Sequence, residues 1–157
     1  KPAYFSYYLM NKLGETELKN TDTSSCATKN DNGNVQLLFW DSTFTLPEKD
    51  VNNQAYYIKD LPSKSKGEIE IEIEGLKKGK YNLEIYKVGY KVNDAFADYL
   101  AMGKPSQLSL EQVKSMKQKN SGAPIAIEKI SIDASGKYRT SYKINENDVV
   151  FFNFIKQ

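Results

Sequence analysis

Four glutamates at every second position are the most conspicuous side chains that could do chemistry. The segment GEIEIEIEG places them at Glu68, Glu70, Glu72 and Glu74. Glycoside hydrolysis needs two carboxylates flanking one sugar bond. Alternate residues of an extended chain share one face, however, so these carboxylates should lie side by side in solvent. We expect loose pairing with the lysines that follow them, Lys77, Lys78 and Lys80. The pattern favours a solvated strand face over a catalytic pair.

The residue types of other common catalytic and metal sites are scarce. The chain has no histidine and one cysteine, Cys26. Because histidine is the commonest general base and metal ligand, serine–histidine and cysteine–histidine catalysis within these residues is excluded. Residues 30–33, NDNG, resemble a calcium loop but lack its downstream glutamate, so a plain turn is the better interpretation. We predict no catalytic residue, no metal site and no cofactor.

Aromatic side chains raise a different chemistry, the stacking of sugar rings. Trp40 ends the apolar run VQLLFW, where a large ring is expected to fill the core. Tyr56 and Tyr57 lie in an irregular segment and are the better candidates for contact with a xylan-type oligosaccharide. A carbohydrate-binding module is therefore an alternative function.

Size and charge exclude several classes of protein. The 157 residues suit one domain with its own core. Lys plus Arg number 22 and Asp plus Glu number 20, which argues against a nucleic-acid or membrane-surface partner. No apolar run is long enough for a transmembrane helix. A single cysteine leaves the compartment, secreted or cytoplasmic, undetermined.

Residues 67–90 carry the clearest structural pattern. The isoleucines between the glutamates share the opposite face, and after a turn at residues 76–79 the alternation resumes with Tyr81, Leu83 and Ile85. Two such runs joined by a short glycine-containing loop predict an antiparallel hairpin with one buried face. A lone hairpin is marginal, so further strands must cover that face.

Further strands are predicted on both sides of this segment. They fall at residues 26–29, 35–41, 54–58, 125–132, 138–144 and 149–154. The apolar phase changes between Ile127 and Ile130, which predicts a bulge near Glu128. The last strand is apolar on both faces and should be covered on both sides. The pattern predicts a mainly β fold, a two-layer antiparallel β-sandwich with an N-terminal helix and a small helical insert.

The helical insert is expected at about residues 93–120. Asn93 is placed to cap a helix over residues 94–102, which Gly103 would close. Ser109 and Gln112 have the spacing of a capping box, opening a second helix that runs to Lys119.

The first 14 residues, KPAYFSYYLMNKLG, predict a helix that starts near Pro2 and stops before Gly14. Its apolar stripe is extended by Tyr7 and Met10, and the stripe itself consists of Tyr4, Phe5, Tyr8, Leu9 and Leu13. A helix that is apolar on most sides is expected to be buried on most sides. We interpret residues 1–14 as the terminal helix of a larger body and residues 15–157 as the β-sandwich.

Several segments together resemble the C-terminal part of glycoside hydrolase family 39, the family of β-xylosidases and α-L-iduronidase. The opening KPAYFSYYLMNKLG resembles the final helix of that family's catalytic barrel, and NGNVQLLFWD resembles a long strand of its accessory β-sandwich. The segment GLKKGKYNLEIYKVGYKVNDAFADYLAMGKPSQLSLEQV resembles the hairpin that leads into the family's short helical insert, and GKYRTSYKINENDVVFFNFI resembles its closing strands.

The resemblance implies a retaining, β-xylosidase-like parent enzyme and a catalytic glutamate between Asn and Pro on the barrel. No Asn-Glu-Pro occurs in this chain, so no catalytic position carries over and the fragment itself is not expected to be an enzyme. Its expected partner is the catalytic barrel of the same polypeptide, facing Tyr4, Phe5, Tyr8 and Leu9; a homo-oligomer is the alternative. An immunoglobulin-like adhesion domain is a third class; it would bury the first helix within the chain.

Overall fold

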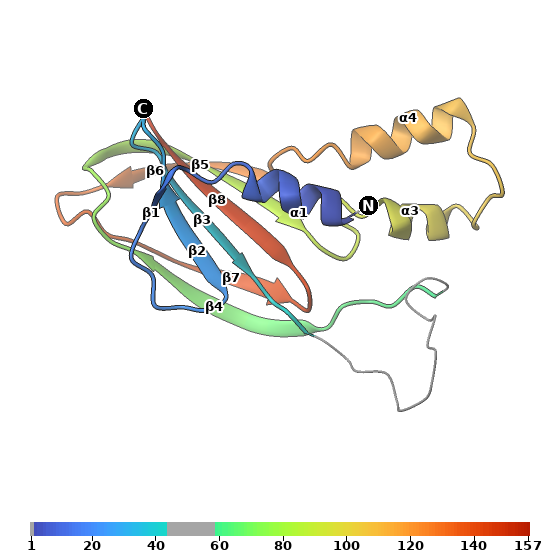
Figure 1. The fold of residues 1–157 in the computed structure, drawn as a ribbon, viewed down its shortest axis with the longest axis horizontal. Helices are drawn as coiled ribbons and strands as arrows, with labels where there is room; N and C mark the ends of the chain where they lie inside the picture. Colours follow the sequence, from blue (N-terminus) through green and yellow to red (C-terminus); the bar gives the residue numbers. More distant parts are fainter. Residues whose placement is uncertain (1, 44–58) are drawn as a thin grey trace.

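The computed structural model describes residues 2–43 and 59–157. It forms two stacked layers, with the first helix lying against one layer and the helical insert projecting at one end (Figure 1). The first half contains α1 (Pro2–Met10), β1 (Thr16–Glu17), β2 (Ser25–Lys29), β3 (Val35–Trp40), β4 (Ser65–Ile73) and β5 (Gly79–Val88). The second half contains α3 (Ala95–Ala101), α4 (Leu110–Lys119), β6 (Ala126–Ile132), β7 (Tyr138–Asn145) and β8 (Val149–Lys156). The strand predicted at residues 54–58 lies outside the described residues.

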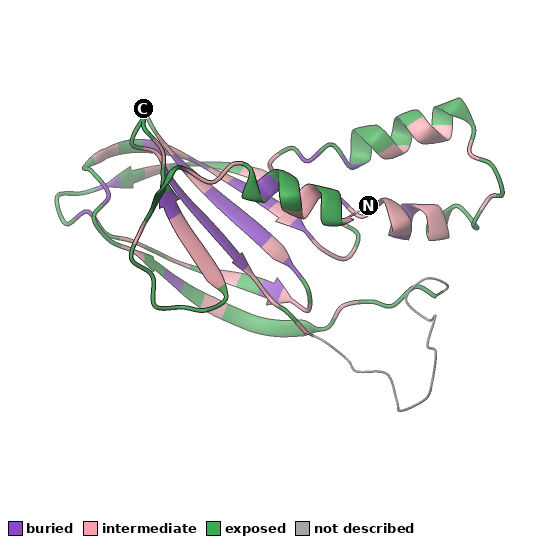
Figure 2. Cartoon of the chain, viewed as in Figure 1, coloured by how far each residue is buried: buried purple, intermediate pink, exposed green. Residues whose placement is uncertain are grey.

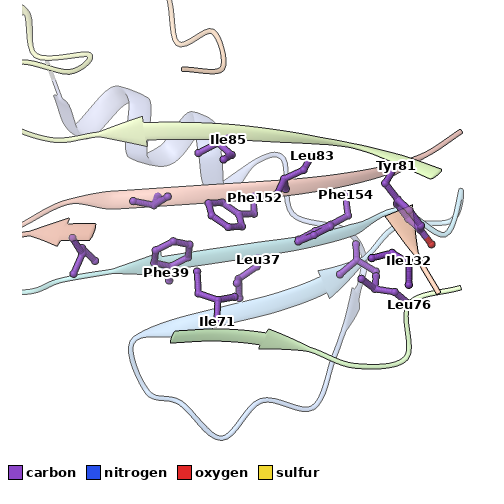
Figure 3. Close-up of a cluster of buried hydrophobic side chains, with 13 residues drawn as sticks. Leu37, Phe39, Ile71, Leu76, Tyr81, Leu83, Ile85, Ile132, Phe152 and Phe154 are labelled. Carbon is purple, nitrogen blue, oxygen red and sulfur yellow. The ribbon is translucent and has the colours of Figure 1, made fainter. Parts of the chain in front are cut away.

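The layers are a six-stranded sheet, in the order β1-β2-β3-β8-β5-β6, and a two-stranded sheet, β4-β7. Every pairing is antiparallel. Between the sheets, aromatic rings pack edge to face, as in Phe39 against Tyr142 with ring centroids 5.6 Å apart. Figure 3 shows Leu37, Phe39 and Phe152 of the large sheet facing Ile71 of the small one. The predicted two-layer β-sandwich is confirmed.

The predicted hairpin over residues 67–90 is wrong in its pairing. β4 pairs with β7, whereas β5 pairs with β6 and β8 in the other sheet. The connection between β4 and β5 crosses from one layer to the other, held by buried Leu76, whose N–H donates to the Gly136 carbonyl at 3.0 Å. The crossing sets the two apolar faces opposite each other across the core. Alternation of apolar and polar residues shows that one face of a strand is buried, but it does not determine which strand is its hydrogen-bonded neighbour.

The last strand, β8, is covered on both faces, as predicted. Val150, Phe152 and Phe154 point into the main core. Phe151 points outwards into a second apolar cluster beneath α1. That cluster consists of Leu9, Leu38, Tyr86, Val88 and Phe151, with Phe5, Leu13, Trp40 and Val149 packed around it. The expectation that Trp40 packs in the apolar interior is confirmed for this second cluster, where it is half-buried.

The bulge predicted near Glu128 is absent from the described β6. Its register with β5 is unbroken from Gly79 opposite Ile132 to Ile85 opposite Ala126. The change of apolar phase has another cause: Ile132 faces the core, while Ile127 is on the outer face and is 61% exposed. Two apolar faces on one strand produced the same sequence pattern as an inserted residue.

The helix ends confirm one prediction and correct two. Ser109 and Gln112 form the predicted capping box of α4. The N-cap of α3 is Asp94 rather than Asn93, because the Asp94 Oδ1 accepts a hydrogen bond from the Ala97 N–H at 3.2 Å. Gly14 is four residues beyond the end of α1. Its lack of a side chain is needed there because a Cβ atom would lie 2.4 Å from the Lys29 carbonyl carbon.

Candidate functional site

The glutamates of β4 form a solvent-facing ladder. All four are exposed, and the partners of Glu68, Glu72 and Glu74 are on β7 or directly before it rather than in the loop that follows β4. Arg139 Nη2 lies 2.8 Å from Glu72 Oε1, and Lys137 binds Glu74, which lowers the pKa of the Glu74 carboxyl. Ser141 Oγ donates to Glu68 at 2.6 Å. The preference for a solvated strand face is confirmed, with the difference that Lys137 and Arg139 replace the lysines expected as partners.

A hollow of about 270 Å³ opens between β4 and the large sheet. Its lining combines Glu70, Glu72 and Glu74 with apolar residues of β2 and β3. Phe39 is the sole aromatic residue of this lining among the described residues and is only 4% exposed. The hollow therefore has no exposed ring on which a sugar would stack.

The predicted sugar contacts, Tyr56 and Tyr57, lie outside the described residues. Across residues 2–43 and 59–157, no three Asp, Glu, Cys or His side chains are grouped to hold a metal ion. In the same part of the chain, no helix is long and apolar enough to cross a membrane.

The four residues predicted to face a barrel divide into two pairs. Leu9 is 2% exposed and packs against the large sheet, and Phe5 packs partly buried beside it. Leu9 therefore points the opposite way from the expectation, because α1 needs it to anchor on its own sheet. Tyr4 and Tyr8 are 65% and 37% exposed on the other side of α1. Figure 2 shows α1 as largely exposed on its outer side.

Other apolar side chains extend this exposed surface. Tyr7 and Met10 of α1 are 71% and 51% exposed. The chain segment leading into β6 lies close by, since a Cβ atom on Gly122 would sit 3.1 Å from the Phe5 ring. We call this surface the outer apolar face; it consists of Tyr4, Tyr7, Tyr8, Met10, Ile125 and Ile127. Sequence reasoning missed Ile125 and Ile127 because it attributed their change of apolar phase to a bulge rather than to an exposed outer face.

A groove of about 280 Å³ continues the outer apolar face towards the insert. α1 contributes Tyr4 and Phe5, and α4 contributes Val113 and Met116. Leu108, just before α4, and Ala95 of α3 complete its apolar lining. No residue of α4 is fully buried. The groove is therefore an open, mostly apolar channel between two helices.

Buried polar contacts hold the insert in place. Asp98, on α3, binds Lys119 of α4 and accepts a hydrogen bond from the Asn120 side chain at 2.7 Å. Burial raises the pKa of Asp98, but hydrogen bonds from Lys119 and Asn120 and the Lys119 charge outweigh it, so the pKa is lowered overall. Asn93 donates to the Lys87 carbonyl at 2.9 Å and accepts from the Gly122 N–H at 3.0 Å. These contacts tie the insert to the end of β5.

Comparison with solved structures identifies the relatives of this fold. A family 39 glycoside hydrolase from Xanthomonas axonopodis pv. citri is 27% identical over 100% of this chain, with a TM-score of 0.89. A monomeric β-xylosidase from Caulobacter crescentus is 25% identical over 99% of it, with a TM-score of 0.87. A bacterial orthologue of human α-L-iduronidase shares the fold alone, at 14% identity and a TM-score of 0.74. No family model and no curated protein matches the chain.

The match covers all or nearly all of this chain but less than a third of each relative. The chain spans 30% of the Xanthomonas protein, 31% of the Caulobacter enzyme and 27% of the iduronidase orthologue. The chain is thus similar, over its whole length, to the C-terminal β-sandwich region of glycoside hydrolase family 39 enzymes.

Proposed function

We propose that this chain is a non-catalytic accessory β-sandwich of a family 39-like glycosidase and that it supports the catalytic barrel of the same polypeptide. The outer apolar face carries the proposal. Four of its exposed side chains are on α1, and two more are at the start of β6, in the segment whose Gly122 approaches Phe5 and Tyr8 of α1. Several large apolar side chains exposed on one short helix mark an interaction site, since burying each of them contributes about 1.5–3 kcal/mol.

The likeness to the β-xylosidase supports a parent enzyme that is a retaining, β-xylosidase-like glycosidase. The carboxylates of this chain do not favour hydrolysis within the domain itself. The β4 carboxylates project from one strand face, and Glu72 and Glu74 pair with Arg139 and Lys137, which leaves them without the opposed arrangement that two-carboxylate catalysis requires.

Two measurements test the proposal. In the full parent polypeptide, Tyr7→Glu should lower the thermal unfolding midpoint, because a charge is buried at the contact with the barrel. In the isolated 157-residue chain the same change should leave the midpoint unaltered, since Tyr7 is 71% exposed there. Glu17→Gln, on exposed β1, is the matched control and should change neither. Hydrolysis of an aryl xyloside by the isolated chain would overturn the non-catalytic assignment.

A further inference from the structure

We propose that the helical insert forms a second wall of the barrel contact, and that the groove between α1 and α4 takes an amphipathic helix from the rest of the same polypeptide. This inference rests on the proposed function and extends it from α1 to the insert. The groove is lined by Tyr4 and Phe5 on one side and by Val113 and Met116 on the other.

The first support is that α4 is an amphipathic helix without a cover. Its apolar residues Val113 and Met116 face α1 across an open groove, and Leu110 is 85% exposed. None of its residues is fully buried. Most helices of globular proteins cover their apolar stripe with a neighbour. Here the described neighbour leaves a channel instead of a packed seam.

The second support is that the groove is held open by fixed contacts. Asp98 joins α3 to the end of α4 through Lys119 and Asn120. Asn93 joins the same region to β5 and Gly122. A surface whose shape is fixed in advance loses less conformational entropy when a partner binds. This hydrogen-bond network therefore favours α4 as a docking surface over α4 as a mobile surface helix.

The lysines of α4 and the connection of the groove to the outer apolar face indicate which partner fills the groove. Lys117 lines the groove, and Lys114 with Lys117 lines the adjoining side of α4. Two copies of this chain packed by a two-fold axis through α4 would set these lysines against each other, which disfavours self-association. The groove also runs directly into the outer apolar face through Tyr4. This chain covers 30% of the Xanthomonas protein, so about 70% of that relative's length lies outside the matched part. A helix of that remaining chain, apolar on one side and acidic at its flank, fits both surfaces.

Hydrogen exchange of residues 110–119 tests the inference in the full parent polypeptide and in the isolated chain. We expect amide exchange of α4 to be at least about tenfold slower in the parent, because the docked helix must leave the groove before α4 can open there. Met116→Asp should remove that protection, while Ser115→Asp, its exposed neighbour outside the groove, should retain it. The comparison of the two unsubstituted proteins does not depend on how either variant folds.

The outcomes separate this inference from the proposed function. Equal exchange of α4 in both proteins, with Tyr7→Glu still destabilising the parent, would overturn the role of the insert and leave the barrel contact on α1 intact. An absence of any effect at both positions would overturn both. Protection of α4 in the isolated chain that rises with protein concentration would identify a second copy as the occupant and would also overturn the inference.

Discussion

Lys87 Nζ lies 2.7 Å from Asp148 Oδ2, and the two side chains are only 13% and 1% exposed. The pair joins the end of β5 to the turn that precedes β8. Asp148 Oδ2 also accepts the Asn145 N–H at 2.8 Å, and the Asp148 carbonyl accepts the Asp41 N–H at 3.0 Å. Its second oxygen, Oδ1, is buried without a hydrogen-bond partner in the described part of the chain. This ion pair is therefore a structural joint shielded from water.

Replacing Asp148 with Asn should destabilise the fold by about 3–5 kcal/mol, because Lys87 would keep a buried charge without its counter-ion. Lys87→Met in the same background should recover part of that loss. Urea unfolding of the two single variants and the double variant gives the coupling free energy.

The exposed pair of Lys91 and Asp60, with its closest N–O distance at 4.0 Å and side chains 59% and 47% exposed, is the control. Asp60→Asn should change the stability by less than about 1 kcal/mol. If Asp148→Asn has an effect as small as Asp60→Asn, the joint is not structural.

Gly89→Ala should be among the most damaging single-methyl additions in this chain. A Cβ atom there would lie 2.1 Å from Asp148 Oδ1, so the ion pair or the backbone must shift, at a cost of about 1–3 kcal/mol or more. Gly75→Ala is the matched comparison, since its φ is +79° but nothing lies within 4 Å, leaving backbone strain of about 1–2 kcal/mol as its only cost. Chemical unfolding ranks the two; a larger loss for Gly75→Ala would contradict the close approach.

Local sequence patterns predicted the elements that depend on local physics. The Ser109–Gln112 capping box and the two covered faces of β8 follow from spacing alone. The partner of β4 does not, because pairing with β7 depends on contacts between residues far apart in the chain. Asn93 shows the same limit, since its side chain bonds Gly122 instead of capping the next helix.

The outer apolar face could be predicted only in part from the sequence of α1. Tyr4 and Tyr8 belong to a helix that is apolar on more sides than one packed face requires, and both are exposed. Leu9 belongs to the same sequence stripe but turns inwards, because α1 covers Leu38 and Phe151 of its own sheet. Which side of an all-round apolar helix meets its own domain cannot be obtained from the helix sequence.

Ser109→Ala should loosen α4 without unfolding the sandwich. The Ser109 Oγ accepts the Gln112 N–H at 3.2 Å, and the loss of such a cap costs about 1 kcal/mol. Because no α4 residue is fully buried, the effect should stay local. Hydrogen exchange of residues 110–119 should quicken roughly fivefold, in line with that free energy. Ser115→Ala, in the exposed middle of the same helix, should not quicken it. A drop in the midpoint of global unfolding would show that the insert and sandwich unfold together.

The stability of the insert should fall in acid through Asp98. Its folded pKa is lowered, because burial, which raises it, is outweighed by the hydrogen bonds from Lys119 and Asn120 and by the Lys119 charge. An aspartate with a depressed folded pKa stabilises the fold above its unfolded pKa, about 3.9, and this contribution is lost as the pH falls through the lower folded value. Asp98→Asn should therefore differ most from the parent sequence near pH 6 and least near pH 2, measured as exchange of residues 110–119.

Lys119→Met supplies the matched test of that mechanism. Without the ammonium group, the hydrogen bond from Lys119 and its charge no longer favour the Asp98 carboxylate, while burial still opposes ionisation. The folded pKa of Asp98 should rise, so the acid-induced loosening of α4 should begin at a higher pH than in the parent sequence. A transition that stays at the same pH in this variant would show that another carboxylate controls the acid response, since the Lys119–Asp98 contact would then carry no linkage between folding and protonation.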